Sequence, residues 1–213
     1  MINRKVTKPL LRGYFHEWMF FISVGACIPL IANSSNSIEL ASTIIYSIGV
    51  CMMFGFSALY HRVDWRSRVL IIMRQLDHSA IFVMIAGSFT PICLLVLPGN
   101  TGIQLLFLIW IIAGIGILQT VLFTETPRLI RAGIYLVAGY VAIPYLSVMS
   151  SVMSMTNFIL TAASGTIYTV GAIGYGFQFP DISPKYFGYH EFFHILVSIA
   201  AVLHFIVIYS IVG

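Results

Sequence analysis

Seven long apolar segments, almost free of charge, dominate this sequence of 213 residues and constrain its fold more than any other feature. Each segment is long enough to cross the hydrocarbon core of a bilayer, which takes about 20 residues of α-helix. A helix satisfies its own backbone hydrogen bonds, so helices are the structures that such segments form in lipid. The expected spans cover roughly residues 14–33, 39–61, 76–97, 102–123, 130–150, 157–179 and 188–212.

The composition agrees with a membrane location for the whole chain. Hydrophobic residues make up 59% of the sequence and charged residues only 8%, whereas a typical soluble domain has about a quarter charged residues. The connections between the segments are short and rich in turn-forming residues, such as NSSNS at 33–37 and LPGNTG at 97–102. We therefore expect a single domain over residues 1–213, an all-α integral membrane protein with a seven-transmembrane helix bundle.

The lysines and arginines lie on one side of the expected topology. They precede the first span or lie around the connections between spans 2 and 3, 4 and 5, and 6 and 7: Arg4, Lys5, Lys8, Arg12, Arg62, Arg66, Arg68, Arg74, Arg128, Arg131 and Lys185. The positive-inside rule then predicts a cytoplasmic N-terminus and, after seven crossings, a C-terminus outside. The net charge of +4 reflects this topology and contact with anionic headgroups, so no nucleic-acid partner is expected.

Ionisable side chains within spans are costly in energy and mark functional sites or internal pairs. Here they gather at one depth, near the cytoplasmic ends of three spans. His61 ends the second span, Asp77 begins the third, and His190 and His194 begin the seventh. The last two lie about one helical turn apart, so both rings can reach one ion. His204 lies about 21 Å beyond His190 along the helix, and we expect it to be a packed or hydrogen-bonded polar residue.

These positions predict a three-histidine zinc site made of His61, His190 and His194. Three protein ligands with an open fourth position are typical of a catalytic zinc. Asp77 would then accept a proton from the water, and Ser57, one turn from His61, would hydrogen-bond a substrate carbonyl or the developing oxyanion. Haem is the competing assignment, but two histidines on one helix cannot occupy opposite faces of its iron.

The string HEFFH at 190–194 also fits the H-E-x-x-H pattern of zinc metalloproteases, in which the glutamate is the general base. The third histidine of metzincins would fall at Ala200. Intramembrane zinc proteases supply an aspartate from a later segment, whereas LDH at 76–78 precedes HEFFH here. We therefore expect Asp77, rather than Glu191, to supply the base.

Three segments carry a family resemblance: FSALYHRVDW (56–65), RQLDHSAIFVMIAGSFTP (74–91) and FGYHEFFH (187–194). Together they resemble the haemolysin III proteins of bacteria, within the superfamily of the adiponectin and progestin receptors and the alkaline ceramidases. KPLLRGYFHEW at 8–18 is similar to the opening of some members. The resemblance covers almost the whole chain in order. It implies a seven-span, multi-pass protein of the bacterial inner (plasma) membrane with a cytoplasmic N-terminus.

Residue by residue, the resemblance implies that His61, His190 and His194 are the zinc ligands. It also implies that Asp77 is the acid that holds the water on the metal, and that Ser57 is the serine of the S-x-x-x-H motif.

The first span and its neighbourhood depart from the family pattern. Other members carry acidic residues and an Asn-Ser pair before the first histidine, whereas Tyr14 and Phe15 precede His16 here. We therefore expect His16 and Glu17 to lie at the membrane interface. His78 is ordinary in the bacterial branch of the family, and we do not count it as a ligand.

These features favour a zinc-dependent membrane hydrolase that acts on an amide or ester bond of a lipid at the cytoplasmic leaflet. The reaction type rests on the chemistry of the site and on analogy with the ceramidases. The expected partner is a membrane lipid, as substrate or ligand. A non-enzymatic sensor or regulator of membrane lipid composition, in which zinc ties spans 2 and 7 together, is the alternative from another class. A membrane-lytic protein and an intramembrane zinc protease are less favoured, the former because no span is lined by charge.

Overall fold

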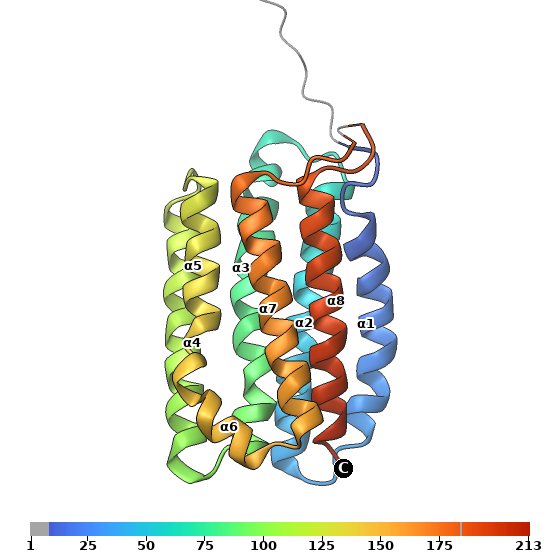
Figure 1. The fold of residues 1–213 in the computed structure, drawn as a ribbon. Coiled ribbons are helices and arrows are strands. Elements are labelled where there is room, and N and C mark those ends of the chain that lie inside the picture. Colours follow the sequence, from blue (N-terminus) through green and yellow to red (C-terminus); the bar gives the residue numbers. More distant parts are fainter. Residues whose placement is uncertain (1–8, 184) are drawn as a thin grey trace, which may run out of the picture.

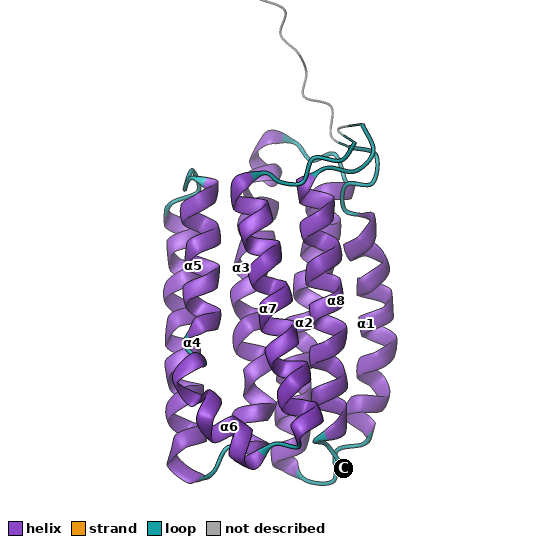
Figure 2. Cartoon of the chain, viewed as in Figure 1, coloured by secondary structure: helices purple, strands orange, loops and turns teal. Residues whose placement is uncertain are grey.

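The structure, a computed structural model, describes residues 9–183 and 185–213 as a bundle of roughly parallel helices joined by short loops (Figures 1 and 2). The α-helices in chain order are α1 (Tyr14–Ala32), α2 (Ser37–Arg62), α3 (Ser67–Pro91), α4 (Gly99–Leu122), α5 (Arg128–Tyr140), α6 (Leu146–Val152), α7 (Met155–Phe177) and α8 (Tyr189–Ser210).

Seven helical stretches in the described part of the chain are long and apolar enough to cross a membrane, which confirms the sequence prediction. Two of them are composite. The third stretch runs from α3 into a π-helical turn, Ile92–Val96, directly after Pro91. The fifth joins α5, a 3₁₀ turn at Ile143–Tyr145 and α6.

The break in the fifth stretch differs from the continuous span that the sequence predicts over residues 130–150. Pro144 lies in the 3₁₀ turn between α5 and α6. Proline has no backbone N–H, and its ring clashes with the preceding helical turn, so it kinks or breaks a helix, and here the α-helical stretch is interrupted. The short α6 consequently runs obliquely across the lower end of the bundle in Figure 1.

Every lysine and arginine of the described residues lies at or near one end of the bundle, the upper end in Figure 1. This end also carries the loops at 63–66, 123–127, 178–183 and 185–188, and the C-terminus lies at the opposite end. Arg4, Lys5 and Lys8, which also enter the topology argument, lie outside the described residues. The basic residues that share one side in the predicted topology therefore also share one end of the bundle in the structure. The orientation of that end in the membrane stays a prediction.

Close packing of α2 against α3 fixes the frame of the site. A Cβ atom on Gly49 would lie 3.1 Å from the Val83 carbonyl oxygen, and one on Gly87 would lie 3.2 Å from that of Ile45. Small residues at such crossings let two helix backbones approach closely in a membrane. This approach packs α2, which carries His61, closely against α3, which carries Asp77.

Candidate metal centre

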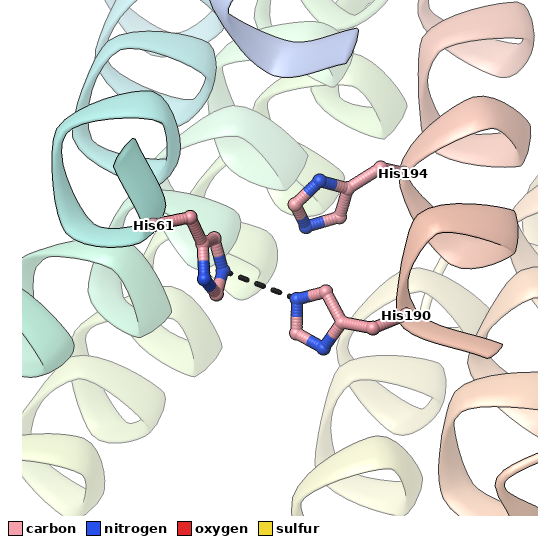
Figure 3. Close-up of side chains that lie close together, drawn as sticks. All are labelled: His61, His190 and His194. Carbon is pink, nitrogen blue, oxygen red and sulfur yellow. Dashed lines mark hydrogen bonds between the residues drawn. The ribbon is translucent and has the colours of Figure 1, made fainter. Parts of the chain in front are cut away.

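Two helices bring three histidines together at the upper end of the bundle. His61 lies in the last turn of α2, and His190 and His194 lie in the first two turns of α8. One ligand atom from each of the three side chains lies within 4.8 Å of the others. Figure 3 shows the rings converging, with the Nε2 atoms of His61 and His190 3.1 Å apart. The structure therefore brings together all three histidines predicted as ligands.

The geometry and the donor set fit a zinc ion. Two nitrogens bound at 2.0–2.1 Å in a tetrahedral zinc site lie about 3.3 Å apart, close to the His61–His190 separation. His194 is 1% exposed, and its Nδ1 has no hydrogen-bond partner among the described residues. Three imidazoles that converge in this way are suited to a borderline-soft cation such as zinc.

Asp77 and Ser57 both lie beside this cluster, as the sequence predicts. The Oδ2 atom of Asp77 is 3.8 Å from His61 Nε2, and the Asp77 side chain is buried. Ser57 is 3% exposed and lies one turn before His61 on α2. Both residues line the same cavity as His190 and His194.

His16 also belongs to this cluster, so the expectation that it lies at the membrane interface is wrong. It is 2% exposed, and its ring stacks on that of His194. Its Nδ1 atom is 2.8 Å from the Ser57 hydroxyl oxygen. One signal was available in the sequence: His16 begins its span at the same depth as His61 and His190. Depth alone does not show which way a side chain points around a helix, and the packing of α1 decides that.

Glu17 and His78 lie outside the three-histidine cluster. Glu17 is half-exposed and forms an ion pair with Arg62 at 2.8 Å, as expected for the interface. His78 approaches Asp77 at 4.0 Å and Arg131 at 3.5 Å. It is not one of the three clustered histidines.

Glu191, the candidate base of the protease pattern, has a structural role at the start of α8. Its side chain is fully buried. One carboxylate oxygen accepts a hydrogen bond from Arg12 Nε, and the other accepts one from the Gly188 backbone N–H at 2.8 Å. The second bond caps the helix N-terminus. Both oxygens are thus engaged, which argues against Glu191 as a general base.

The segment before α1, residues 9–13, packs across this end of the site. The backbone N–H groups of Leu10 and Leu11 donate to the carbonyl oxygens of Lys185 and Tyr186, at 3.0 and 3.2 Å. Gly13 has a φ of 85°, and a Cβ atom there would lie 2.7 Å from His61 Cβ. Only glycine adopts this conformation readily and leaves the required space. The first and last parts of the chain therefore enclose His61 together.

A cavity of about 490 Å³ extends from the histidine cluster into the bundle. Its walls are mostly apolar and come chiefly from α3, α5, α7 and α8, with Ile81, Met84 and Val197 among them. The exposed residues Tyr140, Ile143 and Thr166 also line it, so it reaches the outer surface of the bundle between α5 and α7.

His204 lies deep in this cavity, away from the histidine cluster, and is hydrogen-bonded as the sequence predicts. It is 4% exposed. Its Nε2 atom lies 3.1 Å from the Ser88 carbonyl oxygen, and its Nδ1 atom lies 3.3 Å from the Ser164 hydroxyl.

The chain is similar to known membrane protein families over most of its length. The family model described as Haemolysin-III related matches residues 4–205. The chain is 30% identical to Hemolysin-3 of Bacillus cereus over 173 residues, which cover 79% of this chain and 78% of that protein. It is 29% identical to the Hemolysin-3 homolog of Bacillus subtilis, over 80% and 81% of the two chains. The human Monocyte to macrophage differentiation factor is 24% identical over 92% of this chain and 81% of its own.

Proposed function

The chain belongs to the haemolysin III-related family, and from this premise we propose that it is a zinc-dependent hydrolase of an amide or ester bond in a membrane lipid. One observation carries the proposal. The His61–His190–His194 cluster, with Asp77 and Ser57 beside it, opens directly into an apolar cavity of about 490 Å³. This combination of a polar reaction centre and an apolar chamber suits a ligand with a polar head and an acyl chain.

His61, His190 and His194 would hold the metal in this proposal. When bound, a zinc ion supplies a Lewis acid that polarises a carbonyl and activates water. Asp77 is the nearby acid, with its Oδ2 atom 3.8 Å from His61 Nε2. It accepts the proton that the attacking water releases and delivers it to the leaving nitrogen or oxygen.

Ser57 is the donor for the substrate carbonyl. A hydroxyl has one hydrogen and two acceptor positions. When the Nδ1–H tautomer of His16 donates to Ser57 Oγ, over the 2.8 Å between them, the Ser57 hydrogen is available to the neighbouring Asp77 carboxylate or to a substrate. That hydrogen can then point to the oxygen of the substrate carbonyl, where negative charge develops. His16 thereby orients Ser57.

The opening between α5 and α7 provides the route for an acyl chain. Tyr140 lies twelve residues after Arg128, about 18 Å along the fifth stretch. This depth corresponds to the middle of a bilayer, where lipid tails lie. A substrate would therefore place its chain in the cavity and its scissile bond near the histidines, at the depth of the cytoplasmic headgroups.

The experiment that tests this function is incubation of the purified, zinc-loaded protein with total bacterial lipid extract, with products identified by mass spectrometry. We expect release of a fatty acid or a lyso-lipid by the wild type and none by Asp77→Asn. Asp64→Asn, which changes an exposed loop acid, serves as the matched control and should retain activity. Absence of any product from the zinc-loaded wild type would overturn the proposal in favour of a non-enzymatic sensor.

A further inference from the structure

A second polar cluster lies at the far end of the cavity, where the proposed hydrolysis does not need one. His204 of α8, Ser88 of α3, and Ser164 and Thr161 of α7 all line the cavity there. All four are buried. His204 lies ten residues after His194, about 15 Å along α8. The two polar ends of the cavity are therefore separated by a largely apolar passage.

The hydrogen bonds within this far cluster leave one acceptor, the Nδ1 atom of His204, poorly satisfied. His204 Nε2 is 3.1 Å from the Ser88 carbonyl oxygen, which only accepts, so Nε2 carries the hydrogen. In a neutral imidazole, Nδ1 is then an acceptor. The Ser164 hydroxyl lies 3.3 Å from Nδ1 and 2.8 Å from the Thr161 carbonyl oxygen. Its single hydrogen favours the shorter bond to Thr161, which leaves His204 Nδ1 without a donor of its own among the described residues.

The Ser88 hydroxyl supplies a donor that is also unused. No hydrogen bond involves this hydroxyl among residues 9–183 and 185–213, and only the Ser88 carbonyl is engaged, by His204. Ser88 lines the cavity. An unpaired hydroxyl or imidazole nitrogen in an apolar interior is unfavourable. The far end of the cavity thus presents one unused donor and one unused acceptor to whatever occupies it.

We propose that this far cluster, His204 with Ser88 and Ser164, is a subsite for a hydroxyl group on the acyl chain of the bound lipid. A hydroxyl is the group that accepts from Ser88 Oγ and donates to His204 Nδ1 at the same time. A carbonyl would only accept, and an ammonium group would bring an unpaired charge into an apolar cavity. The preferred lipid is therefore a hydroxylated one, with its hydroxyl about 15 Å from the metal end.

This inference shares one premise with the proposed function, namely that a lipid chain occupies the cavity. Its test measures binding and does not require the protein to hydrolyse a substrate. The probes are ω-hydroxy fatty acids and unsubstituted fatty acids of matched and graded chain lengths, which contain no amide or ester bond. Binding to the full chain in detergent is measured by calorimetry. We expect the ω-hydroxy acid to bind about fivefold more tightly at the chain length that spans the cavity, as one net hydrogen bond provides. Shorter chains should show no preference.

Substitutions assign the preference to named residues. Ser88→Ala removes only the hydroxyl and should bring the two affinities to within about twofold, with the unsubstituted acid unaffected. His204→Leu should do the same and provides a second variant. Ser47→Ala is the matched control, because its hydroxyl is also buried, forms no standard hydrogen bond with the described residues, and does not line this cavity. It should keep the full preference.

The outcomes separate this inference from the proposed hydrolysis. Equal affinities for both probe series, or a preference that survives Ser88→Ala, would overturn the hydroxyl subsite and leave the hydrolase proposal standing. Binding of neither series would overturn the subsite and the lipid-holding role of the cavity together. Hydroxyl-dependent binding by a protein that releases no product from lipid extract would retain the subsite and overturn the hydrolase.

Discussion

The imidazole rings of His16 and His194 stack face to face, with their centroids 3.7 Å apart and their planes 8° from parallel. The contact joins α1 to α8 at the candidate metal centre. His16 also meets the Ser57 hydroxyl on α2 at 2.8 Å. One side chain therefore orients a candidate ligand and a candidate substrate-binding serine.

The two roles of His16 can be separated by substitution. His16→Ala removes the stacking surface from His194, and we expect zinc affinity to fall about tenfold, as for other residues that orient a ligand. His16→Phe keeps a flat ring against His194 but removes the hydrogen bond to Ser57. This variant should keep most of the zinc affinity and lose most of the hydrolysis. Competition with a chelator measures the affinity, and unchanged affinity in His16→Ala would contradict the orienting role.

The ligand assignment predicts close to one zinc per chain in the purified protein, measured by elemental analysis. His61→Ala, His190→Ala and His194→Ala should each lose most of it, because two imidazoles hold zinc far more weakly than three. His78→Ala is the control, since His78 lies near Asp77 but outside the cluster. Undiminished zinc in a double variant at His190 and His194, or a Soret band, would count against the assignment.

Glu191→Gln should destabilise the protein while leaving the chemistry of each folded molecule largely intact. The substitution breaks a buried ion pair with Arg12, for which a loss of roughly 3 kcal/mol is expected. The half-exposed pair of Glu17 and Arg62 provides the comparison, and Glu17→Gln should lose less than about 1 kcal/mol. Thermal unfolding and the activity per folded molecule are the two measurements. A stable but inactive Glu191→Gln protein would favour the metalloprotease reading.

Gly13→Ala should disturb the site through the backbone. The φ of 85° disfavours any side chain with a Cβ atom, and the new methyl group would lie 2.7 Å from His61 Cβ. We expect a loss of stability of about 1–2 kcal/mol and weaker zinc binding, because His61 must move. Gly114→Ala in α4, where the space around the new atom is open, should be neutral or slightly stabilising. Similar zinc affinities for both variants would exclude a tight contact at Gly13.

The topology prediction concerns the orientation of the bundle. Reporter fusions after Gly213 and within the 97–102 loop should behave as external, and one in the 123–127 loop as cytoplasmic. A cytoplasmic signal from either of the first two fusions would show that the bundle has the opposite orientation in the membrane. The histidine cluster would then lie in the outer leaflet.

Much of the site could be predicted from sequence because residue spacing gives depth along a helix, and the expected spans placed His61, Asp77, His190 and His194 at one depth. The structure begins α3 earlier than expected, at Ser67, so Asp77 lies well inside that helix, yet its carboxylate still lies beside His61. The charge asymmetry predicted on which side of the membrane these residues lie. The i, i+4 spacing of His190 and His194 predicted that both rings lie on one face of their helix. These relations predict a common depth, and the packing of α2, α3 and α8 brings the side chains together.

The rotation of helices and the shape of the cavity could not be predicted in this way. Seen along the sequence, His16 is a polar residue at the start of a span, and only the packing of α1 turns it inward against His194. His204 was correctly expected to be hydrogen-bonded, but its unused acceptor depends on Ser164 and Ser88 from two other helices. Such relations arise from tertiary packing, which a single sequence leaves unspecified.

The enclosure of His61 by residues 9–13 and by α8 has a consequence for biogenesis. The ribosome delivers the N-terminal segment first and α8 last, yet Leu10, Leu11 and Arg12 make their contacts with residues 185–191. A nascent chain that still lacks its final helix has one of the three clustered histidines and no surface on which its leading segment can dock. If the cluster binds zinc as proposed, metal loading would be a late event that follows synthesis of α8, because two of the three histidines lie on that helix.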